Sequence, residues 1–369
     1  MRIERYRSDN YRNLKPIEFQ PADSVNVLFG ENAQGKTNII ESIWLFTGCQ
    51  SFRTRKCREL VGPDGQTAKL ELDFFADGRE QTVVMTIGDK REVLLNGIKL
   101  ETPRKLLGSF PAFVFSPSSL SIVRDGPSEK RKFLDIAISV IKPGYAAALS
   151  RYIKTMAHRN AMLRALCERG GDERVLDALD EQLSALGAGI IANRMACAGR
   201  IFEKARAIYE GISSGREVLD CKYIPGFKTD AAGRPELTAE MLRKLTESRD
   251  TDIRRQMTGA GPHKDDIQID INGLCARAYG SQGQQRSCAL ALKLAEAAVI
   301  EELCGEKPVA LLDDVMSELD CSRQSYLLGF FSGWQVFITC CDPSVLSRVE
   351  SGKTFEIKAG DIVGETKSQ

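Results

Sequence analysis

Residues 25–45 read VNVLFGENAQGKTNIIESIWL, and this stretch decides the fold. Residues 24–29 are mostly apolar and β-branched, which is typical of a buried strand. The run leads into residues 30–37, GENAQGKT, which match the phosphate-loop pattern G-x-x-x-x-G-K-[ST] without a gap. Apolar residues such as Ile39 and Ile43 then recur at helical spacing, so the loop opens a helix. A strand, a glycine loop and a helix are the context that this pattern requires, which disfavours a chance glycine-rich turn.

The chemistry of this loop predicts a bound nucleoside triphosphate with Mg²⁺. Gly30 and Gly35 allow successive backbone N–H groups to converge on phosphate oxygens, and the helix N-terminus adds a partial positive charge. We expect Lys36 to reach the β and γ phosphates and the Thr37 hydroxyl to take one position on Mg²⁺. The expected ATP contacts are Gly30, Glu31, Asn32, Ala33, Gln34, Gly35, Lys36 and Thr37.

Two adjacent carboxylates follow a second apolar strand at residues 308–312. Successive residues at a strand end point in different directions. We therefore expect Asp313 to hold Mg²⁺, directly or through water, and Asp314 to polarise the attacking water as a general base. An apolar strand that ends in two aspartates is usually structural, but a phosphate loop in the same chain favours the catalytic interpretation. Lys36 and Asp313 lie far apart in the sequence, so a large insertion separates the two halves of the site.

A third small-residue loop, YGSQGQQRS at residues 279–287, precedes a helical pattern. A hydroxyl, flexible glycines and free N–H groups at a helix start suit an anionic phosphate. Ser281 also suits an ordinary helix N-cap, and the spacing alone leaves both interpretations open.

The composition is that of a globular protein, with 43% hydrophobic and 27% charged residues. No apolar run approaches the ~18 residues of a membrane span, and the N-terminus lacks the apolar core of a signal peptide, so we expect a cytoplasmic protein without membrane contact. Eleven cysteines without a C-x-x-C pair, and only two histidines, argue against a zinc site and for reduced, mostly buried thiols. Because the net charge is +1, any DNA binding must come from local basic patches.

The pattern along the chain predicts an α/β part at residues 1–127 and 257–369 that is split by a helical insertion at 128–256. Asn96-Gly97 and Asn272-Gly273 mark tight hairpin turns. The longest helical stretch, 175–209, is compatible with a short antiparallel pair of helices. Strands are expected at 2–6, 14–19, 68–75, 81–87, 92–100, 110–115, 266–271, 274–279 and 335–339, and helices at 133–141, 145–166, 283–302 and 322–331.

The order of the three motifs resembles the ABC-type ATPase heads of the SMC class. Residues 281–285 resemble their signature loop, and residues 317–320, SELD, resemble their dimer loop. Several finer stretches resemble the RecF family of bacterial DNA replication and repair proteins. They are residues 30–37, 50–54, 115–117, 131–135, 261–266 and 280–286. The resemblance spans nearly the whole chain, while the short helical insertion and the missing hook cysteines differ from the long-armed relatives.

This resemblance implies an α/β fold: a P-loop ABC-type ATPase head with a mixed sheet, flanking helices, an antiparallel β lobe and an inserted helical domain. It also implies a nucleotide site shared between two chains. The signature loop, Ser281, Gln282, Gly283 and Gln284, would contact the γ-phosphate held by the partner's phosphate loop. ATP would then close a homodimer, and hydrolysis at Asp313 and Asp314 would release it. Arg12 lies where such heads often place a nucleotide-contacting arginine, although a surface turn residue remains the alternative.

Three departures from the pattern concern the γ-phosphate. Many relatives have Glu where this chain has Asp314, and the shorter side chain is expected to slow hydrolysis. Many heads have a histidine after the last core strand, where this chain has Cys340-Cys341-Asp342. No glutamine follows residues 110–115, and Ser116 is the candidate substitute.

The resemblance further implies binding of single-stranded and junction DNA, with RecR and RecO as partners in loading RecA. Two basic clusters are candidates for phosphate contacts. They consist of Arg53, Arg55, Lys56 and Arg58, and of Arg124, Lys130, Arg131 and Lys132. Solvated charged loops are the alternative for both. His263 is predicted to be a structural loop residue and His158 a surface or packing residue.

Two other classes of function remain open on the sequence. One is a monomeric P-loop phosphotransferase that acts on a small metabolite, which offers no role for residues 281–285. The other is a scaffold that binds ATP without hydrolysing it.

Overall fold

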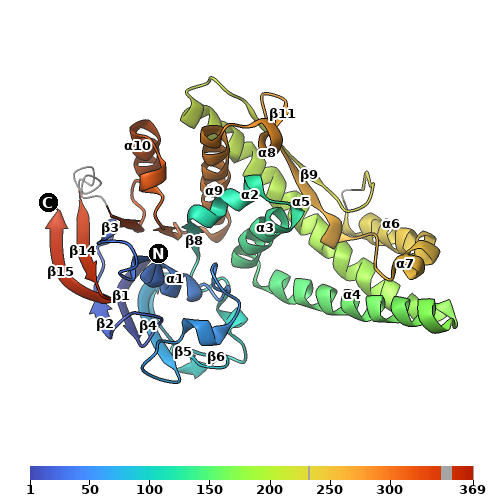
Figure 1. Ribbon diagram of the computed structural model, residues 1–369, viewed down its shortest axis with the longest axis horizontal. Coiled ribbons are helices and arrows are strands. Elements are labelled where there is room, and N and C mark those ends of the chain that lie inside the picture. Colours follow the sequence, from blue (N-terminus) through green and yellow to red (C-terminus); the bar gives the residue numbers. More distant parts are fainter. Residues whose placement is uncertain (232, 342–350, 369) are drawn as a thin grey trace. The chain divides into compact units, whose positions relative to one another are not determined.

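The computed structural model describes residues 1–231, 233–341 and 351–368 (Figure 1). The chain divides into two compact units. The first unit is Met1–Ser119 with Glu296–Gln369, and the second unit is Leu120–Ala295. The second unit contains the predicted insertion at 128–256 but begins before it and ends after it. The reason for the later end is a strand inside the insertion that pairs with a strand beyond it.

A six-stranded sheet with the order β15-β14-β3-β13-β12-β8 lies at the centre of the first unit. Its strands are β3 (Val25–Phe29), β8 (Ala112–Phe115), β12 (Val309–Leu312), β13 (Val336–Cys340), β14 (Gly352–Lys358) and β15 (Asp361–Ser368). All neighbouring strands are parallel except β14 and β15. The residues of β8, β12 and β13 are all buried, as expected for central parallel strands. Parallel strands end at one edge, so the segments that follow β3, β8, β12 and β13 meet there.

Among the described residues, two α-helices lie wholly in the first unit. Helix α1 (Lys36–Leu45) follows β3, and helix α10 (Cys321–Phe330) lies between β12 and β13 in the chain. Helix α1 packs against β8, β12 and β13. It buries Ile39, Ile43 and Trp44, which confirms the helical pattern after the phosphate loop. The N-terminus of α1 therefore lies at the edge of the sheet where the strands end.

The predicted antiparallel β lobe is a second six-stranded sheet in the first unit, with the order β2-β1-β4-β5-β6-β7. Its strands are β1 (Arg2–Asp9), β2 (Ile17–Phe19), β4 (Ala68–Ala76), β5 (Arg79–Ile87), β6 (Arg91–Leu95) and β7 (Ile98–Lys99). Residues of β4 alternate between buried and partly exposed, so one face of the strand packs in the core. Asn96 and Gly97 both have positive φ, 51° and 80°, which confirms the hairpin turn.

The second unit is mainly helical, with one three-stranded antiparallel sheet. Its helices are α2 (Ser121–Arg124), α3 (Pro127–Ile141), α4 (Pro143–Arg169), α5 (Asp177–Ser213), α6 (Arg234–Glu247), α7 (Arg249–Arg255) and α8 (Ala276–Tyr279). Its strands are β9 (Leu219–Ile224), β10 (Asp266–Ile271) and β11 (Leu274–Cys275). Helix α5 packs against α4, α6 and β9. Helix α9 (Gln282–Cys304) begins in the second unit and ends in the first.

Four predictions about local structure are wrong. Of the stretch 175–209, residues 177–209 belong to one long helix, α5, which packs against α4 instead of folding back on itself. The insertion is not purely helical, because β9 completes a sheet with β10. The strand predicted at 274–279 ends at Cys275, and α8 follows. The eleven cysteines are all thiols outside any disulfide, but most are not buried; only Cys197, Cys288 and Cys340 are.

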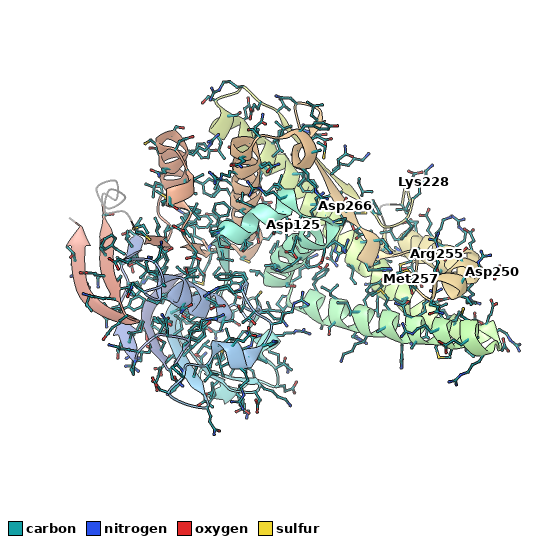
Figure 2. All side chains as sticks on the ribbon, in the orientation of Figure 1. Asp125, Lys228, Asp250, Arg255, Met257 and Asp266 are labelled. Atoms are coloured by element: carbon teal, nitrogen blue, oxygen red, sulfur yellow. The ribbon has the colours of Figure 1, made fainter. Side chains whose placement is uncertain are left out.

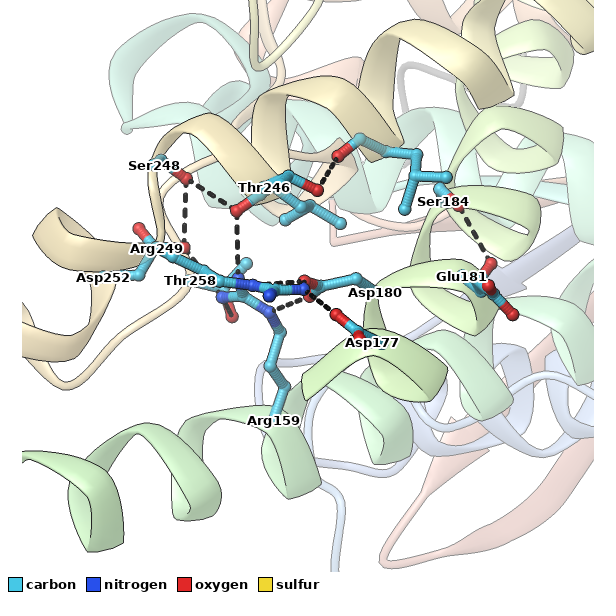
Figure 3. A network of polar contacts seen from close by, with 12 residues as sticks. Arg159, Asp177, Asp180, Glu181, Ser184, Thr246, Ser248, Arg249, Asp252 and Thr258 are labelled. Carbon is cyan, nitrogen blue, oxygen red and sulfur yellow. Dashed lines mark hydrogen bonds and ion pairs between the residues drawn. The ribbon is translucent and has the colours of Figure 1, made fainter. Parts of the chain in front are cut away.

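A buried polar network holds the helices of the second unit together (Figure 3). Arg159 of α4 has no exposed side-chain surface. Its Nε donates a hydrogen bond to Asp180 Oδ1 (2.6 Å), and its Nη1 donates to Asp252 Oδ2 (2.7 Å) and Thr258 Oγ1 (3.1 Å). Arg249 Nη2 donates to Asp180 Oδ2 at 2.8 Å. Each buried charge thus has a partner of opposite charge, which a buried ion requires.

Both histidines lie where the sequence predicts. His263 has a structural role, because its Nδ1 is 2.7 Å from the Tyr152 hydroxyl and its Nε2 is 3.0 Å from the Thr258 carbonyl oxygen. Burial lowers the pKa of His263 below its ordinary value. His158 is an exposed residue of α4.

Two kinds of feature are absent from the part of the chain that the structure describes. None of its helices is long and apolar enough to span a membrane. No cluster of three or more histidine, cysteine or carboxylate side chains is arranged to hold a metal ion there.

Candidate functional site

The phosphate loop connects β3 to α1 and has the backbone shape that its glycines permit. Gly30 has φ 156°, and a Cβ there would lie 2.3 Å from the Ile357 carbonyl oxygen. Gly35 has φ 113°, and a Cβ there would lie 2.8 Å from Leu14 Cδ2. A larger residue at Gly30 would clash with backbone, so glycine is required there by space as well as by conformation, whereas at Gly35 the positive φ is the main requirement.

Lys36 is the first residue of α1, and its side chain folds back over the loop. Its Nζ donates hydrogen bonds to the carbonyl oxygens of Gly30 (2.5 Å) and Glu31 (2.7 Å), and Lys36 is only 7% exposed. The helix N-terminus has no side-chain cap, so its free N–H groups face the same loop. A lysine ammonium and an uncapped helix start in one loop form an anion site.

The turn at Ala359-Gly360, between β14 and β15, contacts the phosphate loop. Gly360 N donates to the Gln34 carbonyl oxygen (2.9 Å), and Ala359 N donates to Gln34 Oε1 (2.6 Å). Asn13 Nδ2 donates to the Ala33 carbonyl oxygen (3.2 Å). The turn between β14 and β15 therefore fixes the phosphate loop, and neither strand is predicted by the sequence pattern.

Asp313 lies at the end of β12 and faces the phosphate loop. Its Oδ1 accepts hydrogen bonds from Thr37 Oγ1 (2.8 Å) and Thr339 Oγ1 (3.0 Å). Burial raises the pKa of Asp313 above its ordinary value of 3.8, and the two hydroxyl donors partly oppose this rise. The predicted Mg²⁺ residues, Thr37 and Asp313, are thus adjacent.

Asp314 points elsewhere, as expected for the next residue at a strand end. It has φ 52° and is exposed, while Asp313 is 4% exposed. Asp314 N donates to Thr339 Oγ1 (2.8 Å), and Asp314 Oδ1 accepts from Ser317 Oγ (2.9 Å). The two carboxylates therefore have different surroundings, which suits a metal ligand and a base.

The donor set at Thr37 fits Mg²⁺. A hydroxyl and a carboxylate 2.8 Å apart are hard oxygen ligands, and Mg²⁺ is commonly held by one or two protein oxygens, phosphate oxygens and water. Thr37 and Asp313 would hold the ion, which would neutralise phosphate charge. Thr339, a hydroxyl within an apolar strand, orients Asp313 and was not singled out in the sequence.

Arg12 forms a buried ion pair beside the loop. Its Nε and Nη2 donate to the two carboxylate oxygens of Glu41 at 2.5 and 2.8 Å, and Glu41 also accepts from Ser51 Oγ at 2.5 Å. Glu41 has no exposed side-chain surface. A carboxylate among Ile40, Ile43 and Trp44 was the sequence signal for this pair, because a buried charge needs a partner.

The position of the expected histidine is held by a cysteine that contacts the phosphate loop. Cys341 is exposed, and its Sγ accepts a hydrogen bond from Lys36 Nζ (3.2 Å) and lies 3.1 Å from Asn32 Oδ1. Cys340 is the buried last residue of β13. Asp342 lies outside the described residues. Ser116, the candidate for the missing glutamine, is buried at the end of β8, with its Oγ 2.8 Å from Ser118 Oγ.

The signature loop lies in the second unit and begins α9. Ser281 N donates to Gln284 Oε1 (2.8 Å), and Gln284 N donates to Ser281 Oγ (3.2 Å). This reciprocal pair is a capping box, so the N-cap interpretation of Ser281 is confirmed. Ser281 and Gln282 are exposed, Gly283 is half-buried, and Gln284 Nε2 donates to Glu217 Oε1 (2.8 Å). The contact with a partner's phosphate stays a prediction.

Comparisons with known proteins decide between the open interpretations. The family described as RecF/RecN/SMC N terminal domain matches residues 2–360. The DNA replication and repair protein RecF of Acetivibrio thermocellus is 36% identical over 368 residues, which cover 96% of this chain and 100% of that protein. RecF of Clostridium acetobutylicum is 39% identical over 342 residues, 92% of this chain and 93% of that protein. The chain belongs to the RecF family.

Solved structures agree with this assignment. The structure described as the recombination mediator protein RecF-ATPrS in the RecFOR pathway is 36% identical, with a TM-score of 0.91 over 100% of this chain and 98% of that chain. The structure described as RecF-ATP in the same pathway is 37% identical, with a TM-score of 0.90 over 99% of this chain and 97% of that chain. An Smc head domain from Pyrococcus furiosus shares the fold. It is 14% identical, with a TM-score of 0.57 over 99% of this chain and 96% of that chain. The predicted fold, an SMC-like ABC-type ATPase head, is confirmed, and a metabolite phosphotransferase is not favoured.

The two basic clusters that RecF resemblance assigned to DNA are largely engaged within the chain. The contacts are Arg53 with Asn38 and Glu41, Lys56 with Glu59, Arg58 with Asp89, Arg124 with Gln285, Lys130 with Ile267 and Asp266, and Arg131 with Asp265. The Lys130 side chain is only 11% exposed, and its ammonium donates to a backbone carbonyl oxygen at 2.6 Å. Arg55 is exposed and has no partner among the described residues. DNA contacts by these clusters stay predictions.

Proposed function

We propose that this RecF-family chain is an ATP-dependent DNA-binding protein of recombinational DNA repair and replication restart. ATP closes a homodimer on DNA at gaps or single/double-strand junctions, and slow hydrolysis releases it. The observation that carries this proposal is the hydrogen bond between Thr37 and Asp313, which joins the phosphate loop to the catalytic carboxylate.

ATP binds the loop of residues 30–37, with Mg²⁺ as its counterion. Lys36 leaves the loop carbonyl oxygens to meet the phosphates, since an ammonium prefers a phosphate to a neutral acceptor. Thr37 and Asp313 hold the ion, and Asp314 positions the attacking water. Because Asp314 has a shorter side chain than Glu, hydrolysis is slow.

The signature loop of one chain meets the triphosphate of the other. The exposed Ser281 and Gln282 and the helix N-terminus behind them support this role. In this arrangement residues 1–127 and 257–369 act together as the head and residues 128–256 as the insertion. Cytoplasmic location and cooperation with RecR and RecO in loading RecA follow the same proposal. The RecFOR pathway named for the related structures supports it.

The mass of the protein in solution with ATP, with ADP and with gapped DNA tests this function. We expect a dimer with ATP, a monomer with ADP, and DNA binding that depends on ATP. Lys36→Arg should abolish the ATP-dependent dimer. Ser281→Arg should block the dimer while leaving ATP binding intact. A Ser281→Arg variant that still dimerises would exclude the shared site, and phosphate transfer to a small molecule by a monomer would favour a phosphotransferase.

A further inference from the structure

Three cations of α4 differ from most cations of the two predicted DNA clusters, because they have no partner among the described residues. Arg151, Lys154 and Arg164 are exposed residues of this 27-residue helix. Among the described residues, none of the three has an ion-pair or hydrogen-bond partner. By contrast, all but Arg55 of the eight cations in the two clusters predicted to contact DNA are engaged in contacts within the chain.

Helix α4 itself supplies almost no carboxylate to offset these charges. The helix reads PGYAAALSRYIKTMAHRNAMLRALCER, and its single acidic residue is Glu168, close to the C-terminal end. The buried Arg159 is already neutralised by Asp180 and Asp252. Figure 2 shows side chains projecting along the whole length of α4. The exposed side of α4 is therefore a basic surface, defined by Arg151, Lys154 and Arg164.

The spacing of these cations suits a polyanion. At a rise of 1.5 Å per residue, the span from Arg151 to Arg164 is about 20 Å along the helix. Duplex DNA carries one phosphate for each ~1.7 Å of its axis, so all three side chains have phosphates within reach on one duplex. The small exposed residues Ala157 and Ala161 between them leave room for the backbone to approach.

We propose that the basic surface of α4 binds the sugar–phosphate backbone of DNA. This inference rests on the proposed function and adds the place of contact. The two aromatic residues of α4, Tyr145 and Tyr152, are 4% and 1% exposed, so the helix offers no ring on which an unpaired base could stack. The contact is therefore independent of sequence and depends on salt.

The test compares the wild-type chain with the triple variant Arg151→Gln, Lys154→Gln, Arg164→Gln. Gln keeps a good helix former at each exposed position, and circular dichroism confirms the fold. Fluorescence anisotropy with a labelled duplex that carries a single-stranded gap, in ATP and at several salt concentrations, gives the affinity and its salt dependence. We expect affinity about 10-fold or more weaker and a log–log salt slope smaller by about 3, one for each phosphate contact.

The matched control removes three cations of the same unit that already have acidic partners: Arg206→Gln, Arg243→Gln and Lys244→Gln. We expect the control to keep nearly the wild-type slope. An equal loss in both variants, or an unchanged slope in the α4 variant, would overturn the inference while leaving DNA binding itself in place. A wild-type chain that fails to bind the duplex would instead overturn the DNA part of the proposed function, and this inference with it.

Discussion

Thr37 Oγ1 donates a 2.8 Å hydrogen bond to Asp313 Oδ1, although the two residues are 276 positions apart in the chain. Thr37 is the second residue of the helix after β3, and Asp313 directly follows β12. The contact exists because both segments lie at the same edge of a parallel sheet, with β13 between the two strands. It brings a hydroxyl and a carboxylate together beside the phosphate loop.

Replacing the Thr37 hydroxyl tests this contact directly. Thr37→Val keeps the shape of the side chain but removes one oxygen ligand, so we expect the Mg²⁺-dependent affinity for ATP to fall about 10- to 100-fold. Thr37→Ser retains the hydroxyl and should stay close to the wild type. ATP titrations with and without Mg²⁺ measure the effect. Equal affinities of the Val and Ser variants would show that Thr37 is not a ligand.

Asp313→Asn should stabilise the fold while it abolishes hydrolysis. Burial raises the pKa of Asp313, so its carboxylate opposes folding at neutral pH, and the neutral amide removes this cost. We expect a gain of about 1 kcal/mol in the free energy of unfolding at pH 7. As the pH falls through the raised pKa of Asp313, the wild type becomes protonated and the gain should disappear. Urea unfolding at several pH values measures it, and a gain independent of pH would contradict this origin.

Alkylation of Cys341 should block the ATP site. The Cys341 thiol adds to the carbon–carbon double bond of N-ethylmaleimide. The bulky adduct on Sγ would displace the Lys36 Nζ, which lies 3.2 Å from Sγ. We expect treated protein to lose ATP binding and bound ATP to slow the loss. Because Cys167, Cys275 and Cys321 are also exposed, Cys341→Ala is the control. This variant should bind ATP and resist the reagent; inactivation at the wild-type rate would place the sensitive thiol elsewhere.

The buried network of the second unit should dominate its stability. Arg159→Ala leaves the carboxylates of Asp180 and Asp252 buried without their partner, which typically costs about 3–5 kcal/mol. Arg164→Ala, on the exposed side of the same helix, should change stability by less than about 0.5 kcal/mol. Thermal unfolding of both variants compares them. Similar melting temperatures would show that the network contributes little.

Local signals in the sequence predicted much of this fold. The phosphate loop, the Asn96-Gly97 hairpin and the apolar strand before Asp313 each depend on a few neighbouring residues, so their structure follows from short patterns. The proximity of the phosphate loop and Asp313 also follows, because each comes directly after a buried strand and Thr37 contacts Asp313. Strands β14 and β15 were missed because residues 351–368 alternate charged and apolar residues only weakly.

Such short patterns do not predict contacts between segments that are distant in the sequence. The pair of Arg12 with Glu41 depends on how the β lobe packs against α1, and the contact of Lys36 with Cys341 depends on the pairing of β13 with β3. The capping box at Ser281 was readable in the sequence as S-x-x-Q, but a trans contact requires a second chain. DNA contact by the basic clusters stays a prediction for a similar reason, since a list of cations does not reveal which of them already have partners.

The contacts of β14 and the Ala359-Gly360 turn with the phosphate loop affect how truncated homologous genes should be interpreted. A premature stop codon just after residue 350 would leave every ATPase motif of the gene intact. The product would nevertheless lose the Ile357 backbone against which Gly30 fits and the two amides that anchor Gln34. Truncated homologues of this kind should be classed as inactive, however complete their motifs look.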